Sequence, residues 1–138
     1  MKTSIDDCKI IELPKISARQ GNISFVEGIK HIPFSIERVY YIYDVPGGEE
    51  RGAHAHIELM QILISAMGAF DVILDDGNQK KSFHMNRAYY GVLVPRMIWR
   101  EIVNFSSGGI CLVLASQAYN EHDYIRDYSQ FIQSKNSA

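Results

Sequence analysis

The chain has 138 residues, of which 46% are hydrophobic and 22% charged, and its formal net charge is −2 at pH 7. This size and composition predict one soluble globular domain, residues 1–138, with a core that needs no disulfide. A net charge this close to zero argues against a nucleic-acid partner. Cys8 and Cys111 lie far apart and outside any CxxC motif, so we expect both to be reduced. Residues 1–16 carry acids and no long apolar run, so we expect neither a secretion signal nor a membrane span and, by default, a cytoplasmic location.

Along the chain, short apolar runs rich in β-branched and aromatic residues alternate with turn residues, a pattern that predicts β-strands. In chain order we predict strands at Lys9–Leu13, Ile23–Glu27, Glu37–Asp44, Leu59–Ala66, Ala69–Leu74, Lys80–Met85, Tyr89–Val94, Ile98–Phe105 and Ile110–Ala115. Many short strands at this spacing favour an all-β fold, an antiparallel sandwich or barrel.

Turn residues connect these strands, and only the tail differs in character. Asp75-Asp76-Gly77-Asn78 predicts a hairpin turn, because Gly and Asn tolerate the positive φ of tight turns. Residues 45–48 and 106–109 predict further turns. In Glu121–Gln133, Tyr124, Tyr128 and Phe131 fall at i, i+4 and i+7, which predicts a short C-terminal helix.

Polar side chains recur on one face of three separate segments, because side chains alternate between the two faces of a strand. The pairs that share a face are Arg38 and Tyr40, His54 and His56, and Arg100 and Asn104. Trp99 lies opposite Arg100 and is expected in the core. If the polar faces line the interior of a barrel, they converge in a pocket.

Two spacing patterns resemble the signature motifs of the cupin β-barrel. The first is Gly48, five residues, His54, one residue, His56, four residues, Gln61, six residues, Gly68; the second is Gly91, Pro95, Arg100, three residues, Asn104. In metal-binding cupins the positions of Gln61 and Arg100 usually hold Glu and His. The resemblance implies a jelly-roll barrel over residues 29–118, with N-terminal strands in residues 1–28 and a helical tail in residues 119–138.

The histidine pair has three possible roles. His-x-His is a common metal-binding fragment, but a stable site generally needs a third ligand, and Arg100 cannot ligate and repels a cation. The two rings could also be structural, satisfied by hydrogen bonds in the core. We favour acid–base chemistry at His54 and His56, to which imidazole is suited near neutral pH, and expect no metal or other cofactor. His31, His84 and His122 belong to no such constellation and are expected at the surface.

Arginines near these histidines suggest an anionic substrate. The planar guanidinium binds phosphate oxygens in a bidentate manner, so Arg38, Arg51 and Arg100 suit a substrate that carries phosphate. The alternative is solvent-exposed charge, above all for Arg51 in its Gly-rich loop. Gln61 and Asn104, in the two motifs, are candidate substrate contacts. Tyr40 is a candidate proton donor or hydrogen-bond clamp, and packing is its alternative role.

A narrower resemblance rests on five segments: IPFSIERVYYIYD, RGAHAH, VILDDGN, NFSSG and LVLAS…YNEHDYIRDY. From about Ile32 to Tyr128 they resemble the sugar-nucleotide 3,4-ketoisomerases, small metal-independent cupins that act on dTDP-4-keto-6-deoxyglucose. The resemblance implies that the keto group moves from C4 to C3 through an enediol, in the biosynthesis of 3-acetamido-3,6-dideoxyhexoses for bacterial surface glycans such as the O-antigen of lipopolysaccharide. It makes His54 the expected base, with Tyr40 as its partner in proton transfer. His56 becomes a second acid–base or orienting group.

The same resemblance implies substrate contacts and an assembly. Arg38 and Arg51 would hold the diphosphate or the sugar, and Arg126 of the DYIR segment would reach the nucleotide or form a structural ion pair. Family members are homodimers that exchange an N-terminal strand, which also removes an exposed sheet edge. Arg100 favours a product with the gluco configuration at C4, whereas Gln20 matches neither the gluco nor the galacto type.

Three other functions compete with this one. The first is a non-catalytic cupin that binds a sugar nucleotide or a small anion, which would need the arginines but not the histidine pair. The second is a metal-dependent cupin oxygenase or isomerase. The third is a dTDP-sugar 3,5-epimerase, which shares a jelly roll and a histidine base, although this chain is shorter and its RGxHAH and DYIR segments argue against it.

Overall fold

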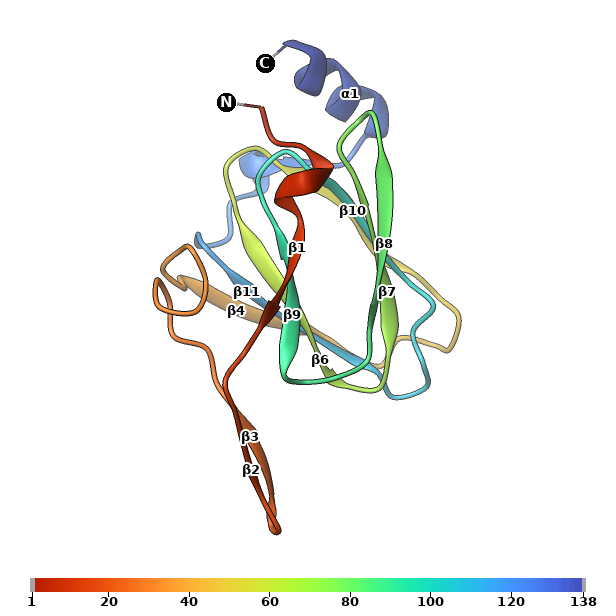
Figure 1. Cartoon of the computed structure of the whole chain (residues 1–138). Coiled ribbons are helices and arrows are strands. Elements are labelled where there is room, and N and C mark those ends of the chain that lie inside the picture. Colours follow the sequence, from red (N-terminus) through yellow and green to blue (C-terminus); the bar gives the residue numbers. More distant parts are fainter. Residues whose placement is uncertain (1, 138) are drawn as a thin grey trace.

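Antiparallel strands dominate the computed structural model, which describes residues 2–137 (Figure 1). In chain order the strands are β1 (Lys9–Glu12), β2 (Lys15–Ala18), β3 (Gly21–Ser24), β4 (Arg38–Ile42), β5 (Arg51–His56), β6 (Gln61–Met67), β7 (Phe70–Asp75), β8 (Lys80–Met85), β9 (Tyr90–Val94), β10 (Trp99–Val103), β11 (Ile110–Ala115) and β12 (Tyr124–Ile125). Short 3-10 helices cover Ile5–Asp7 and Glu121–Asp123, and the α-helix α1 covers Tyr128–Ser137. Within the described residues, no helix is long and apolar enough to span a membrane.

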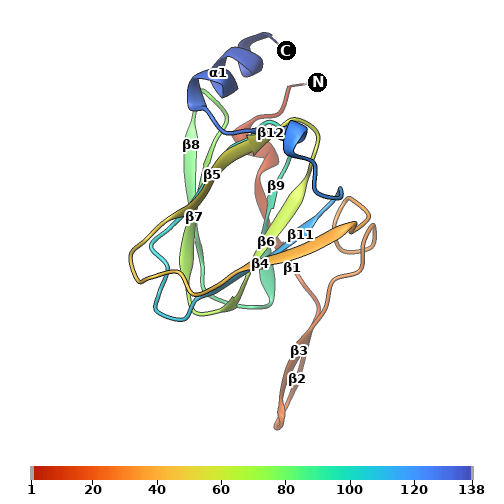
Figure 2. The ribbon, with the colours of Figure 1, turned by 180° about the vertical axis from the view of Figure 1, so that it is seen from behind.

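The strands form two five-stranded sheets. The two sheets face each other, as the views from front and back both show (Figure 2). Their strand orders are β1-β9-β6-β11-β4 and β12-β5-β10-β7-β8, and every pairing between these strands is antiparallel. Alternate residues of both sheets point inward and bury a common core, with Leu63 and Val113 from the first sheet and Val72 and Ile102 from the second. The expected all-β jelly-roll barrel with a short C-terminal helix is confirmed.

The outer faces of the two sheets are covered in different ways. On the first sheet, Ile62 and Leu114 pack with Ile32 and Phe34 from the segment that precedes β4. On the second sheet, Trp99 and Ala55 pack with Ile125 and with Phe131 of α1. Trp99 is therefore a core residue, as expected, and its neighbour Arg100 points the opposite way, into the barrel.

Several predicted elements differ from those in the structure. The sequence patterns did not predict β2, β5 or β12, and the second predicted strand, Ile23–Glu27, lies at Gly21–Ser24 in the structure. Alternation is hard to detect in β2 and β3 because they form an exposed hairpin of their own. The hairpin turn at Asp75–Asn78 is confirmed: Asp76 Oδ1 accepts the amides of Asn78 and Gln79, and Gly77 has φ +92°.

The predicted start of the C-terminal helix is wrong, because α1 begins at Tyr128 and not at Glu121. The side chain of Asn120 accepts the amide of His122 and caps a single 3-10 turn. The chain then pairs with β5 as β12, with Tyr124 opposite His56. The helical spacing of Tyr124 with Tyr128 and Phe131 therefore arises from packing on two successive elements and not from one helix.

The hairpin β2–β3 projects away from the barrel at the end opposite α1 (Figure 1). Its strands pair with each other and with no other strand among the described residues. Ile16 and Ile23 are cross-strand partners in this hairpin, and they are 55% and 61% exposed. An isolated two-stranded hairpin is at best marginally stable in water, so these side chains lack the cover that a third layer would provide.

Candidate active site

Three strands bring the polar faces together at a cavity of about 810 Å³. β5 and β10 are neighbours in one sheet, where His54 lies opposite Arg100, and β4 carries Tyr40 across from them in the other sheet. The residues that line the cavity are Tyr40–Val45, Pro46, Glu49, Glu50, Arg51–His54, Arg100, Tyr124 and Arg126. The strand alternation predicted from the sequence thus produces one interior pocket.

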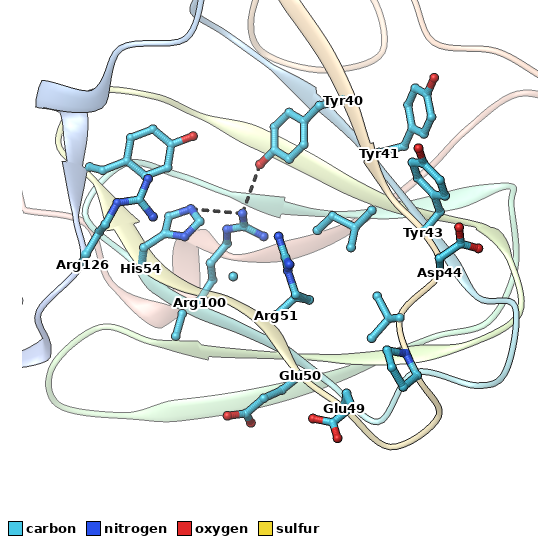
Figure 3. A pocket seen from close by; sticks show the side chains of 16 residues that line it. Tyr40, Tyr41, Tyr43, Asp44, Glu49, Glu50, Arg51, His54, Arg100 and Arg126 are labelled. Carbon is cyan, nitrogen blue, oxygen red and sulfur yellow. Dashed lines mark hydrogen bonds between the residues drawn. The ribbon is translucent and has the colours of Figure 1, made fainter.

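A chain of hydrogen bonds connects the two sheets inside this pocket (Figure 3). Arg100 Nη2 donates to Tyr40 Oη at 3.1 Å and contacts His54 Nε2 at 3.1 Å. Tyr40 Oη in turn donates to Gln61 Oε1 at 3.1 Å. Gln61 and Arg100 are each only 1% exposed. These buried bonds hold the tyrosine hydroxyl and the imidazole in one orientation toward the cavity.

His54 and His56 contact each other as well, with their Nε2 atoms 3.1 Å apart and their rings nearly perpendicular. Burial lowers the pKa of His54 to about 2, and the Arg100 guanidinium acts in the same direction. Burial likewise lowers the pKa of His56 to about 3, again with Arg100 as the next cause. Both imidazoles are therefore neutral at physiological pH, the form in which a histidine can accept a proton.

Arg100 has donor groups that the protein leaves unused. Its Nε and Nη1 are buried and have no hydrogen-bond partner among residues 2–137. Gly52, at φ +75°, makes room for the guanidinium, since a Cβ at this position would lie 3.3 Å from Nη1. Buried donors are normally satisfied, so the unused ones point to an anionic or carbonyl ligand in the cavity.

Other arginines approach the same space. Arg51 points into the cavity beside Arg100, and Glu49 and Glu50 also line it (Figure 3). Arg38 stacks on the ring of Tyr40 at 4.9 Å, and its Nη2 donates to Tyr124 Oη at 3.5 Å. No carboxylate within residues 2–137 pairs with Arg38, Arg51 or Arg100.

Arg126 is at the rim of the cavity, where it has two kinds of partner. It donates two hydrogen bonds of 2.9 Å to Glu121 and lies 4.3 Å from the centre of the Tyr124 ring. The pair with Glu121 is solvent-exposed, with side chains more than half accessible. The structural ion pair considered for Arg126 is therefore present, and the residue still lines the cavity.

Asp123 and Tyr124 are site residues that the sequence analysis missed. The Tyr124 ring packs against both imidazoles, with ring centres 4.9 Å from His54 and 4.4 Å from His56. Asp123 Oδ2 lies 3.3 Å from His56 Nδ1. Both residues belong to the DYIR segment from which only Arg126 was selected. The expectation of a helix there concealed the strand pairing that turns Tyr124 toward the histidines.

Asn104 is not brought to the pocket, in contrast to the prediction. It follows β10 with φ +57°, is exposed, and donates from Nδ2 to Asp71 Oδ2 at 2.9 Å on the outer surface. The regular alternation that placed Asn104 on the face of Arg100 ends with β10 at Val103, so the extrapolation by two residues fails. Of the other histidines, His84 and His122 are exposed as expected, whereas His31 is half-buried and its Nδ1 accepts the amide of Glu27.

A cation site would need ligands that these residues do not provide. Within residues 2–137 there is no group of three or more His, Cys, Asp and Glu side chains that could hold a metal ion. The positions that usually complete a cupin metal site hold the Gln61 amide and the Arg100 guanidinium. A metal bound to His54 Nε2 would have to displace the Arg100 contact at 3.1 Å. The donor set therefore does not fit a divalent metal.

Comparison with known proteins places the chain in a family. Residues 6–136 match the family model described as "FdtA: WxcM-like, C-terminal". A curated relative from Aneurinibacillus thermoaerophilus, TDP-4-oxo-6-deoxy-alpha-D-glucose-3,4-oxoisomerase, is 45% identical over 123 residues, which are 89% of this chain and 88% of the relative.

Solved structures of similar proteins agree with this. The WlaRB TDP-quinovose 3,4-ketoisomerase from Campylobacter jejuni is 43% identical, with a TM-score of 0.89 over 94% of this chain and 99% of that one. The 3,4-ketoisomerase QdtA from Thermoanaerobacterium thermosaccharolyticum is 34% identical, with a TM-score of 0.94 over 97% of both chains. The latter structure is a histidine-to-asparagine mutant in complex with TDP-4-keto-6-deoxyglucose. The chain therefore belongs to the sugar 3,4-ketoisomerase family and is an isomerase.

Proposed function

We propose that the protein converts dTDP-4-keto-6-deoxy-D-glucose into a dTDP-3-keto-6-deoxyhexose by acid–base proton transfer through an enediol. The observation that carries this proposal is the buried hydrogen-bonded set of Tyr40, Arg100, His54 and His56 at one cavity. Relatives named for TDP-sugar 3,4-isomerisation support the substrate class. The cavity of about 810 Å³ is in the range of ligand pockets in general.

The chemistry needs one base and a stabiliser of oxyanion charge. A proton leaves C3 and a proton is added at C4, while O3 loses its hydroxyl proton and O4 gains one, so the reaction needs no net proton. We assign the base to His54, which is neutral and presents Nε2 to the cavity region beside Arg100. Arg100, with unused buried donors, would stabilise the negative charge that develops on O4.

Tyr40 and His56 are the other two residues to which we assign roles in proton transfer. The Tyr40 hydroxyl lies between Arg100 and Gln61, and burial raises its pKa, which keeps it protonated and able to donate. We assign it the transfer of the hydroxyl protons at O3 and O4. His56 contacts His54 through Nε2 and serves as a second acid–base or orienting group.

The arginines account for binding of the anionic part of the substrate. We propose that Arg51, Arg38 and Arg126 hold the diphosphate and the adjoining sugar. Arg51 and Arg126 line the cavity, and Arg38 stacks on Tyr40, which also lines it. Neither Arg51 nor Arg38 pairs with a carboxylate in the described chain. Gln61 acts indirectly, by orienting the Tyr40 hydroxyl. Asn104 has no place in this proposal, since it lies on the outer surface. No metal is required, because Arg100 supplies the positive charge that a metal would otherwise provide.

We propose that the product has the gluco configuration at C4. Arg100, the residue that the family resemblance links to this outcome, contacts both the proposed base and the proposed hydroxyl donor. The C. jejuni relative is named for TDP-quinovose, a gluco-configured 6-deoxysugar, in line with this assignment. The product would then be consumed by an amino-transfer and an acyl-transfer reaction in the cytoplasm, as the precursor of a 3-acetamido-3,6-dideoxyhexose of the cell surface.

The assembly we propose is a homodimer with exchanged N-terminal strands. The projecting hairpin β2–β3 exposes Ile16 and Ile23. At the edge of the first sheet, β4 and the residue after it expose Val39, Tyr41 and Tyr43. Exposed apolar surface next to an open edge favours association of strands between chains. A second copy would cover both features at once.

The deciding experiment is proton NMR of the purified protein with dTDP-4-keto-6-deoxyglucose in D₂O, with a matching 3-aminotransferase present to trap the unstable product. We expect a 3-amino sugar, and large H3–H4 and H4–H5 couplings would identify the gluco configuration. Absence of conversion, together with absence of deuterium at C3, would refute the isomerase function and favour a non-catalytic sugar-nucleotide binder. A 3-amino product with a small H4 coupling would refute only the gluco assignment.

A further inference from the structure

Asp123 is a buried carboxylate, 7% exposed, in the turn before β12. Three consecutive main-chain amides after β5 donate hydrogen bonds to this one residue. Ile57 N donates to its main-chain oxygen at 2.9 Å, Glu58 N to Oδ1 at 2.8 Å and Leu59 N to Oδ2 at 3.2 Å. The pairing of Tyr124 with His56 holds the turn against the same strand. The amide hydrogen bonds and the strand pairing together fix the position of the carboxylate relative to His56.

The same carboxylate faces the imidazole of His56. Asp123 Oδ2 lies 3.3 Å from His56 Nδ1, yet this nitrogen is buried and has no hydrogen-bond partner among residues 2–137. A buried polar atom left without a hydrogen bond costs about 1–3 kcal/mol, so such an arrangement calls for a reason.

The hydrogen-bond directions explain why the bond is not formed. A guanidinium can only donate, so the contact with Arg100 assigns the lone pair to His54 Nε2. His56 Nε2 must then carry the proton of the contact between the two rings. A neutral His56 with its proton on Nε2 presents a lone pair on Nδ1, which cannot bond to a carboxylate. Any proton that reaches Nδ1 turns this repulsive contact into a charge-assisted hydrogen bond.

We propose that Asp123 is a positioning residue of the isomerase, which orients His56 and supplies the negative charge that balances the histidine pair while it holds the proton of the substrate. This inference rests on the proposed function. The proton taken from C3 adds one positive charge to the pair, and its return to C4 removes that charge, so the balance is zero over the cycle. Without Asp123 the additional charge would be created beside arginines alone.

The surroundings of His56 make this carboxylate distinctive. The charged and titratable side chains that face His56 come from every element packed around it: Arg38 of β4, His54 of β5, Arg100 of β10, Asp123 of the 3-10 turn, Tyr124 of β12 and Arg126 after it. Burial and the three arginines all lower the pKa of His56. Asp123 supplies the one carboxylate of this set, 3.3 Å from His56 Nδ1.

The test is Asp123→Asn, which keeps the shape of the side chain and removes its charge. We expect kcat to fall at least about 10-fold, with the affinity for dTDP within about 2-fold of wild type. Asp123→Glu keeps the charge and should recover part of kcat. An unchanged kcat in a folded Asp123→Asn protein would overturn the proposal.

Two controls separate this proposal from other causes. Asp71→Asn removes a carboxylate that pairs with His84 at 2.6 Å outside the pocket, and it should not change kcat. ¹⁵N NMR of labelled histidine rings at pH 7 needs no turnover: we expect the Nδ1 signal of His56 to shift in Asp123→Asn, where an amide replaces the carboxylate 3.3 Å away, and an unchanged signal would overturn the inference. If the wild-type protein showed no isomerisation, the proposed function would fail, while this signal would still report on Asp123. If Asp123→Asn did not fold, the test would rest on Asp123→Glu: a kcat close to that of wild type would support the proposal, and a complete loss of kcat in the folded variant would overturn it.

Discussion

Arg100 Nη2 lies 3.1 Å from His54 Nε2, at the point where the two residues stand opposite each other in the pairing of β10 with β5. The proposed base is thus held in place by a cation that also weakens it, since a nearby positive charge disfavours the protonated imidazole. An anionic substrate beside Arg100 would offset this charge and strengthen the base when substrate is bound. The site would then become a strong proton acceptor only with its ligand in place.

Replacing His54 with Asn should abolish isomerisation and preserve binding. The amide keeps much of the polarity of the imidazole but cannot accept a proton, so we expect kcat to fall by about 10³-fold, with the affinity for dTDP within a few-fold of wild type. The coupled aminotransferase assay and calorimetric titration with dTDP measure the two effects. Loss of binding in parallel with turnover would assign His54 to ligand contact and not to proton transfer.

Replacing Tyr40 with Phe removes the hydroxyl that joins Arg100 and Gln61 across the two sheets. We expect kcat to fall by about 10²-fold, because the proton donor is lost and the guanidinium is no longer oriented. Tyr90→Phe is the matched control: it removes a tyrosine hydroxyl that donates to Asn86 Oδ1 at 2.6 Å, outside the cavity. Steady-state kinetics of both variants would contradict the assignment if the two losses were equal.

The buried histidines should make the fold sensitive to acid. The folded chain keeps His54 and His56 neutral with pKa values of about 2 and 3, whereas the unfolded chain takes up protons on both below about pH 6.5. Their contribution to stability is therefore fully present above pH 6.5 and is lost as the pH falls through the range toward 3. At pH 5 the loss is about 2 kcal/mol for each histidine.

Thermal unfolding between pH 7 and pH 5 measures this effect. The melting temperature of the wild type should fall over that range, and the fall should be smaller in the double variant His54→Gln with His56→Gln. His84→Gln, on the exposed outer surface, should keep the wild-type loss. An equal loss in the double variant would mean that other groups, such as the carboxylates, govern acid unfolding.

Arg51 should govern affinity more than turnover. Its side chain points into the cavity and has no partner in the described chain, so Arg51→Gln removes a charge that is available to the diphosphate (Figure 3). We expect the Kd for dTDP to rise by about 10-fold, with a weaker dependence of binding on salt. Arg87→Gln, an exposed arginine outside this cavity, should leave Kd unchanged. A purely kinetic defect in Arg51→Gln would place this residue at the reacting atoms instead.

The projecting hairpin should control assembly. Ile16→Asp together with Ile23→Asp places charge on both members of an exposed cross-strand pair, which would be desolvated if the hairpin packs on a second copy. We expect a shift from dimer to monomer in sedimentation velocity at micromolar concentration. A wild-type protein that sediments as a monomer would refute the exchanged dimer, and a dimeric double variant would place the interface elsewhere.

Much of the fold was predictable because its signals are local. Nine strands were expected, and eight of them overlap the barrel strands within a few residues, since alternation and turn residues depend on neighbours in the chain. β5 was not predicted, because its residues RGAHAH include few side chains of the β-branched type that indicates a strand. The shared face of His54 and His56 was nevertheless predicted. β12 was not predicted, because two residues are too few to show any periodicity. This strand forms only through its pairing with β5.

From the sequence alone, motif spacing and strand alternation determined which side chains gather at the pocket: Tyr40, His54 and Arg100 line it, and Gln61 and His56 contact Tyr40 and His54. The loss of two metal-ligand types was already visible. These conclusions needed only residue identity and the period of a strand. Which atoms touch was decided by tertiary structure, because β5, β10 and β12 meet only by pairing in one sheet, and β4 reaches them from the other sheet only when the two sheets close. Strand pairing sets Arg100 against His54 and brings Asp123 to His56, and closure of the sheets adds Tyr40 and buries both histidines enough to keep them neutral. It also leaves Asn104 outside, because the strand ends before the alternation reaches it.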